Sequence, residues 1–173
     1  ILEHKLLYGA ASPGGGKALS DNTISEIGAE VPEERYTIPF GKAVVRKEGT
    51  DVTIIGTLVM MHRALAVANE LESEGISCEV IDPRTIYPFD YDTVLASLEK
   101  TGRLVVVHEA NRRSNIGGEI VSQVAERGFG LLREPPRGVA GLDVPMPYNR
   151  ALEALVIPDE ARIIGSIRAV VGR

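Results

Sequence analysis

The clearest pattern in the chain is an apolar run followed at once by polar residues, within Arg103–Phe129. The run Leu104–Val107 is short, β-branched and apolar at every position, as expected for a parallel strand covered by helices on both faces. The polar residues His108–Asn111 follow, and then a loop that contains Gly117 and Gly118. Strand, polar tip, glycine loop and helix form the unit in which open α/β sheets place their binding groups.

The same alternation recurs through most of the chain and predicts an α/β fold. Short connections between strands and helices favour a three-layer, mostly parallel sheet with right-handed crossovers. We place this domain at residues 44–173. The predicted strands are Val52–Thr57, Ile76–Asp82, Leu104–Val107 and Val139–Leu142. The predicted helices are Met60–Glu74, a helix that carries Val94, Leu95 and Leu98 and ends near Gly102, Gly118–Gly128, a turn at Ala151–Leu155, and Asp159–Val171.

Residues 1–43 lack this alternation and are predicted to form an extended arm. Ile1–Tyr8 reads as a short strand, and Gly9–Glu34 as a linker without periodicity. The prolines of Val31–Gly49 favour an extended path along a surface. Gly14–Lys17 does not match a phosphate-binding loop, because alanine occupies both the first glycine position and the position after the lysine. Since the first residue is isoleucine, we interpret the chain as lacking its beginning.

Composition narrows the possible functions. The net charge of −5 and the isoelectric point near 5.3 argue against a general nucleic-acid binder. No apolar stretch approaches the roughly 20 residues of a membrane span, and no signal peptide is evident. The single cysteine, Cys78, excludes an internal disulfide, and its apolar neighbours predict a buried thiol.

The candidate site residues are Arg84, His108, Glu109 and Asn111, at the carboxyl ends of two predicted strands. Adjacent strand residues point to opposite faces, so His108 and Glu109 act on one atom only if the strand ends between them. We therefore favour a supporting or interface role for these residues over direct catalysis. For Arg84 we favour a salt bridge to a neighbouring domain or subunit.

Complete catalytic motifs are not evident elsewhere. His4 and His62 have no neighbours at metal-ligand spacing. No catalytic serine spacing, nucleophile elbow or carboxylate pair stands out. From the residues alone the chain reads as a binding or assembly domain.

Several stretches in order resemble one family. They are EHKLLYG, VPEERYTIPFGKAVVRKEGTDVTIIG, EVIDPRTIYPFD, TGRLVVVHEA and GGEI. They are similar to the carboxyl-terminal half of the beta subunit of thiamine-diphosphate-dependent 2-oxoacid dehydrogenase decarboxylase components, which act on pyruvate, branched-chain 2-oxoacids or acetoin. This half is the transketolase carboxyl-terminal domain, and the resemblance implies one antiparallel edge strand. Two departures are the proline at position 83, where leucine is common, and a longer Ala10–Ala29 segment.

The resemblance also implies a function and partners. The full assembly would decarboxylate a 2-oxoacid oxidatively and acylate lipoyl groups, using thiamine diphosphate and Mg²⁺. Ile1–Tyr8 resembles the last strand of the preceding pyrimidine-binding domain, which carries the family's activating glutamate and active-site histidine. We therefore assign no catalytic, cofactor-binding or metal-binding residue to this chain and expect it to be inactive alone.

The implied partners are an alpha subunit and a second beta subunit in an α2β2 heterotetramer, and the subunit-binding domain of the acyltransferase core. The final helix and the Pro145–Pro158 loop are our candidate subunit contacts. The implied location is the cytoplasm, or the mitochondrial matrix in a eukaryote. The alternative is a stand-alone α/β module that binds a small ligand or nucleotide near Arg84, His108 and Gly117.

Overall fold

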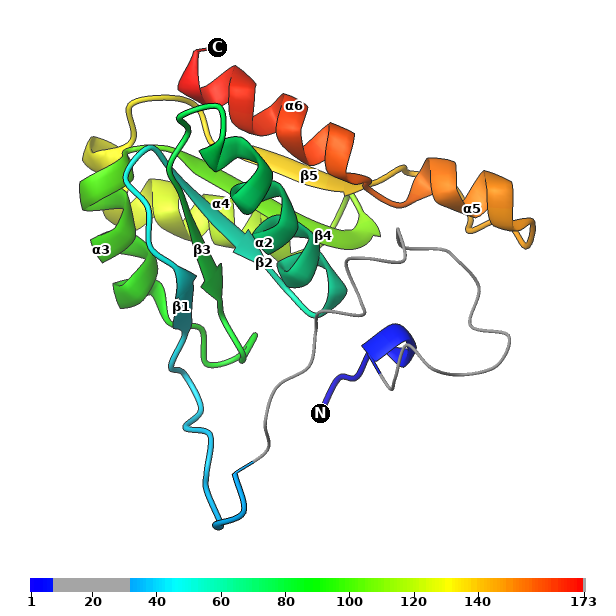
Figure 1. Ribbon diagram of the computed structural model, residues 1–173, viewed down its shortest axis with the longest axis horizontal. Coiled ribbons are helices and arrows are strands. Elements are labelled where there is room, and N and C mark those ends of the chain that lie inside the picture. The colour runs from blue at the N-terminus through cyan, green and yellow to red at the C-terminus, as the bar shows by residue number, and fades with distance from the viewer. Residues whose placement is uncertain (8–31, 173) are drawn as a thin grey trace.

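The structure, a computed structural model, describes residues 1–7 and 32–172 (Figure 1). Most of the predicted Gly9–Glu34 linker therefore lies outside the described residues. The division into an arm and a domain at residue 44 stays a prediction.

A mixed five-stranded sheet lies at the centre of the described residues (Figure 1). Its strand order is β1-β3-β2-β4-β5. The pairs β3–β2, β2–β4 and β4–β5 are parallel, and β1 runs antiparallel to β3 at one edge. This confirms the predicted three-layer, mostly parallel fold with an antiparallel edge strand. The strands are β1 (Val44–Lys47), β2 (Val52–Gly56), β3 (Cys78–Asp82), β4 (Leu104–Asn111) and β5 (Arg137–Gly141).

Helices cover both faces of the sheet. Residues of α2 and α6 pack with Ile54, Val80 and Val105 in one core cluster. Residues of α3 and α4 pack with Ile55 and Val106 in the other. Successive strand residues thus point to opposite cores, which explains why these strands are apolar at every position. The helical segments are η1 (Lys5–Leu7), α2 (Val59–Glu72), α3 (Tyr91–Thr101), α4 (Ile116–Gly128), η2 (Phe129–Leu131), α5 (Arg150–Val156) and α6 (Glu160–Val171).

Helix ends follow local side-chain chemistry. The Asp90 carboxylate accepts a hydrogen bond from the Thr93 amide at 3.2 Å and begins α3. Gly102, in the left-handed region at φ 65°, ends the same helix, as the sequence predicted. Gly117, predicted to lie in the loop before a helix at Gly118–Gly128, is instead in the first turn of α4. Asn115 caps this helix by accepting a hydrogen bond from the Gly118 amide at 2.8 Å, and so begins it earlier than predicted.

Three further predictions differ from the structure. Val44–Lys47 forms an edge strand, because β3 supplies backbone partners for it. Strand β4 continues to Asn111, since β5 pairs with it beyond its apolar part. The predicted strand at Ile1–Tyr8 is wrong for its described part: Lys5–Leu7 is a 3₁₀ turn, with the Leu7 amide donating to the His4 carbonyl at 2.9 Å. A strand needs backbone hydrogen bonds to a neighbouring strand, and no described strand pairs with this segment.

Cys78 is fully buried in the α2–α6 core, as predicted. Burial raises the pKa of its thiol to about 12, and the nearby Asp51 carboxylate adds to this shift. The thiolate required for nucleophilic chemistry is therefore not populated near neutral pH. None of the helices in the described part of the chain is long and apolar enough to cross a bilayer.

Candidate functional site at the carboxyl edge of the sheet

Three turns at the carboxyl edge of the sheet each hold a non-glycine residue with a positive φ angle. They are Leu58 after β2 (φ 52°), Arg84 after β3 (φ 57°) and Ser114 after β4 (φ 52°). No other non-glycine residue in the described ranges has a positive φ. Such conformations cost roughly 1–3 kcal/mol each and concentrate at functional sites. This edge, where the predicted site residues also lie, is the candidate functional site.

Arg84 lies at this edge with its side chain exposed. Its amide donates to the Asp82 carboxylate at 3.1 Å, which fixes the turn. The second oxygen of Asp82 accepts from the Arg46 guanidinium at 2.8 Å. Arg46 rather than Arg84 therefore neutralises Asp82. A salt bridge from Arg84 to a neighbouring domain or subunit stays a prediction.

His62 lies in the first turn of α2, the helix that follows β2, and is near the same carboxylate. Burial lowers the pKa of His62, the Asp82 carboxylate opposes that shift, and the Arg46 guanidinium adds to it. The net direction is downward, so the imidazole is neutral near pH 7. Neither Asp82 nor His62 was among the predicted site residues. The acidic residue directly after an apolar run was the signal that could have found Asp82.

His108 lies inside the sheet edge rather than in an open site. Its side chain is buried, and a Cβ added at Gly117 would stand 2.6 Å from two atoms of the imidazole ring. Burial lowers the pKa of His108 against a smaller opposite effect from the Ala110 backbone. The ring is therefore a neutral group packed under the start of α4. The ring occupies the space beside Gly117, and the alternative small-ligand site near Arg84, His108 and Gly117 stays a prediction.

Glu109 points to the opposite side, as alternation along a continuous strand requires. Its carboxylate meets His4 Nε2 at 2.8 Å, so this contact joins the N-terminal segment to the end of β4. Since the strand does not end between His108 and Glu109, these two side chains are not brought together on one face. Sequence reasoning missed His4 because its partner lies more than a hundred positions away.

Asn111 is the exposed last residue of β4. Its carbonyl accepts a hydrogen bond from the Asn115 amide group at 2.7 Å, and the Arg112 carbonyl accepts from the same group. Asn115 thereby builds the turn that contains Ser114 and also caps α4. An asparagine just before a helical pattern is a recognised start signal, and it could have identified this residue.

The four predicted residues thus share one edge but do not form one cluster. Strand β2 lies between β3 and β4, which puts Arg84 and His108 two strand spacings apart, about 10 Å. One is exposed and the other buried, while Glu109 is bound to His4. The roles predicted for these four residues stay predictions.

The described side chains do not fit a divalent-metal centre at this edge. No group of three His, Cys, Asp or Glu residues in the described ranges could hold a metal ion. Three carboxylates at this edge are already engaged, Asp82 by Arg46, Glu109 by His4 and Asp143 by Arg113. Mg²⁺ with a diphosphate requires free carboxylate oxygens. That this segment alone binds no cofactor stays a prediction.

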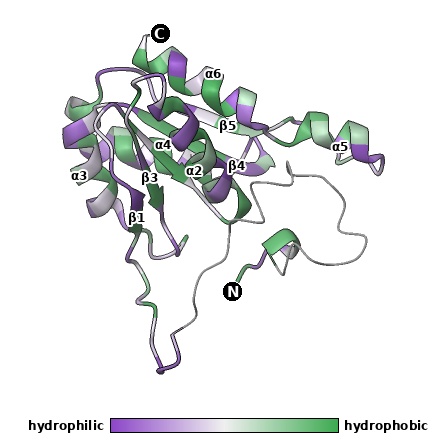
Figure 2. Ribbon diagram, viewed as in Figure 1, coloured by the Kyte–Doolittle hydropathy of each residue, from purple (hydrophilic) through white to green (hydrophobic). Residues whose placement is uncertain are grey.

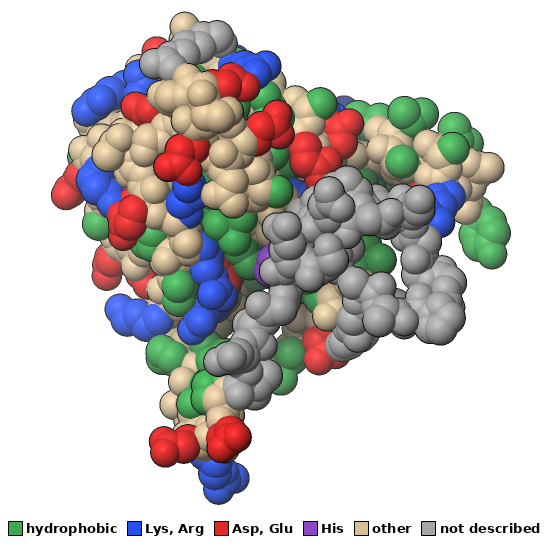
Figure 3. Space-filling model, viewed as in Figure 1, with side chains coloured by type: hydrophobic (Ala, Val, Ile, Leu, Met, Phe, Trp, Pro, Cys, Tyr) green, Lys and Arg blue, Asp and Glu red, His purple; other side chains and the backbone are tan. Residues whose placement is uncertain are grey.

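A second exposed feature is the α5 surface, which we define as Met146, Tyr148, Leu152 and Leu155. Their exposed fractions are 51%, 106%, 52% and 68%. Figures 1 and 2 show α5 projecting beyond the sheet with apolar residues along it, and Figure 3 shows hydrophobic side chains over this part of the molecule. Exposed apolar patches are typical of interaction sites, so the α5 surface is a candidate for one.

Comparison with known proteins places these features in context. A family model described as "Transketolase, C-terminal domain" matches residues 41–163. The chain is 43% identical over 166 residues to the acetoin:2,6-dichlorophenolindophenol oxidoreductase subunit beta of Cupriavidus necator, covering 96% of this chain and 44% of that protein. It is 44% identical over 141 residues to the pyruvate dehydrogenase E1 component subunit beta of Bacillus subtilis. That match covers 82% of this chain and 43% of that protein.

A solved structure gives the same result for the fold. A split-gene transketolase, in an inactive beta4 tetramer, matches with a TM-score of 0.70 and 26% identity. The match covers 83% of this chain and 46% of that one. The chain therefore spans less than half the length of the proteins that it matches.

Proposed function

The chain belongs to the transketolase C-terminal domain family, and from that premise we propose that it is the assembly half of a 2-oxoacid dehydrogenase beta subunit. The full subunit would take part in oxidative decarboxylation of a 2-oxoacid and reductive acylation of lipoyl groups. The observation that carries this proposal is the match to beta subunits over 96% of the chain but only 44% of the relative. The reaction would need thiamine diphosphate and Mg²⁺ in the full assembly.

The geometry of the carboxyl edge supports an assembly role. Two of its carboxylates are held by other groups of the same chain, Asp82 by Arg46 and Glu109 by His4. The buried His108 faces Gly117 rather than a cavity. Side chains already bonded in this way maintain local structure, and bond-breaking groups would come from polypeptide outside this chain.

The α5 surface supports the proposed partners, an alpha subunit and a second beta subunit in an α2β2 heterotetramer. It lies in the Pro145–Pro158 segment, which the sequence already indicated as a contact. Its aliphatic and aromatic side chains have the composition of an interface core. The net charge of −5 would also favour the approach of a basic subunit-binding domain from the acyltransferase core. The cytoplasm, or the mitochondrial matrix in a eukaryote, is the proposed location.

The direct test is a chimera. Residues 1–173 would replace the matching segment of the Cupriavidus necator beta subunit, and the product would be expressed with that enzyme's alpha subunit. We expect co-purification and acetoin-dependent activity, whereas the chain alone should give no turnover with thiamine diphosphate, Mg²⁺ and several 2-oxoacids. Turnover by the chain alone, or a folded chimera without bound alpha subunit, would contradict the proposal.

A matched pair of variants locates the contact. Leu155→Ser in the chimera should weaken subunit association by about tenfold to a hundredfold, because burying a leucine at an interface contributes roughly 1.5–3 kcal/mol. Phe129→Ser is the control, since Phe129 is 75% exposed but lies outside the α5 surface. Analytical ultracentrifugation of the two variants measures the difference. Equal association of both would remove the α5 surface from the proposal.

A further inference from the structure

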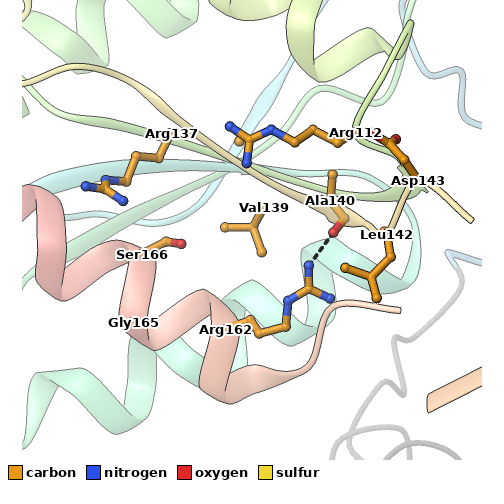
Figure 4. A pocket seen from close by; sticks show the side chains of 11 residues that line it. Arg112, Arg137, Val139, Ala140, Leu142, Asp143, Arg162, Gly165 and Ser166 are labelled. Atoms are coloured by element: carbon orange, nitrogen blue, oxygen red, sulfur yellow. Dashed lines mark hydrogen bonds between the residues drawn. The ribbon is translucent and has the colours of Figure 1, made fainter. Parts of the chain in front are cut away.

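A cavity of about 420 Å³ lies between β5 and α6 and reaches the carboxyl end of β5, but Arg84, His108, Glu109 and Asn111 are not among its lining residues (Figure 4). We propose that this cavity binds the phosphate group of a small phosphorylated molecule. Three arginines from separate segments line it: Arg112 follows β4, Arg137 begins β5, and Arg162 belongs to α6. The site rests on this geometry alone and does not depend on the proposed function.

Among the described residues, no carboxylate forms an ion pair with the three arginines that line the cavity. Asp143 is the one acidic residue among the lining residues. Its two oxygens are taken by Arg113, outside the cavity lining, through a guanidinium contact at 3.1 Å and a backbone hydrogen bond at 3.1 Å. Within the described residues, the guanidinium groups of Arg112 and Arg137 have no hydrogen-bond or ion-pair partner. These groups are free to bind an anion.

Arg162 is held in position without losing its charge. Its Nη2 atom donates to the Ala140 carbonyl at 2.6 Å, and Nη1 donates to the Val156 carbonyl at 3.4 Å. Both acceptors are neutral main-chain groups, so the guanidinium remains a fixed positive group beside the cavity. Figure 4 shows this side chain rising from α6 toward Ala140, with the Arg112 guanidinium on the other side of Val139 in that view. A fixed guanidinium suits phosphate, because little side-chain entropy remains to be lost on binding.

The shape of the cavity narrows the class of ligand. Gly138 and Gly165 line it, and a Cβ added at either would meet no atom within 4 Å, so both leave open space. Ser166 adds a hydroxyl group that can donate to a phosphate oxygen. The volume suits a small molecule. No aromatic side chain is present among the lining residues to stack on a nucleobase, which favours a sugar phosphate or free phosphate over a nucleotide.

The test is calorimetric titration of the whole 173-residue chain with inorganic phosphate, ribose 5-phosphate and AMP at equal ionic strength. We expect phosphate to bind, and ribose 5-phosphate to bind at least as tightly as AMP. Absence of binding by all three at millimolar concentration would overturn the site. Binding of AMP more than about tenfold tighter than ribose 5-phosphate would overturn the ligand class.

Charge variants test the role of the arginines. Arg112→Gln and Arg137→Gln should each weaken binding about tenfold or more, because each removes a charge-assisted hydrogen bond. Both residues are exposed, so both variants should fold normally. Arg150→Gln is the matched control, since this exposed arginine does not line the cavity. An equal loss of affinity in the control would show a non-specific effect of charge and overturn the proposal.

Filling the cavity is an independent test. Gly165→Leu should abolish binding while α6 stays folded, because leucine is a better helix former than glycine and open space surrounds this position. Gly138→Val tests the same cavity from β5. Thermal melts in the absence of ligand confirm that each variant folds. Unchanged affinity in a folded variant of either kind would overturn the assignment.

Discussion

Helices α5 and α6 follow one another in the chain, yet only one of them is part of the core. In α6, Ile163 and Ile167 are fully buried and pack against the sheet. In α5, Leu152 and Leu155 are 52% and 68% exposed, and Val156 is its one buried residue. The apolar side chains of the two helices are similar in size but differ in burial, and so they differ in what they stabilise. Those of α6 stabilise the fold, and those of α5 are available to a partner.

The junction between the two helices is held firmly, so the exposure of α5 is not a result of a loose chain end. The buried Arg63 of α2 donates to the Pro158 carbonyl, and its Nε atom lies 3.7 Å from Glu160. The Val156 carbonyl at the end of α5 accepts a hydrogen bond from the Leu142 amide at 3.1 Å. These contacts fix where α5 leaves the domain, and a partner would meet the α5 surface in a defined position.

The largest expected effect is a difference in stability between matched truncations in α6 and α5. Ile167→Ala should lower the free energy of unfolding by about 2–5 kcal/mol, because it leaves a cavity in a packed core. Leu155→Ala, the same kind of truncation in α5, should change it by no more than about 0.5 kcal/mol. Urea denaturation of both variants measures this difference. Similar losses for the two would mean that α5 also contributes to the core.

A smaller effect tests packing at the carboxyl edge. Gly117→Ala should destabilise the fold by roughly 1–3 kcal/mol, because the new methyl group would stand 2.6 Å from the His108 ring. Gly118→Ala is the matched control in the same turn of α4, where the nearest atom is 3.9 Å away. The control should be neutral or slightly stabilising, since alanine favours helix. Equal stability of the two variants would show that the ring does not fill this space.

The buried imidazole of His108 should make the free energy of unfolding depend on pH, with a smaller effect than Ile167→Ala or Gly117→Ala. Burial lowers the pKa of His108 in the folded protein below its ordinary value near 6.5. The unfolded chain therefore takes up a proton first as the pH falls below about 6.5, and stability decreases from there toward the folded-state pKa. Above that range the histidine has no effect.

A pair of histidine variants assigns this pH dependence. His108→Asn should flatten the loss of stability between about pH 6.5 and 5. Burial lowers the pKa of His62 as well, so this histidine also contributes to the pH dependence of stability. His62→Asn should remove only that contribution and keep the loss of stability that is due to His108. Urea denaturation at several pH values gives the slopes. The same slope in His108→Asn as in the unchanged chain would contradict a neutral buried imidazole.

Local signals in the sequence determined much of the fold. The apolar runs of β2, β3 and β4 and the spacing of Ile163, Ile167 and Val170 are sufficient to place strands and the final helix. Gly102 marks the end of α3 because the left-handed conformation there suits glycine. These features depend on residues close together in the chain, so pattern and propensity reveal them.

Tertiary structure alone decided how the polar residues are used. Strand β4 extends through His108 and Asn111 because β5 continues beside it, and no apolar pattern marks that extension. His4 meets Glu109 across most of the length of the chain. The arginine-lined cavity likewise joins Arg112, Arg137 and Arg162 from three segments. The physical reason is that a sequence pattern reports burial and backbone preference, whereas contacts between distant polar groups depend on how the elements pack.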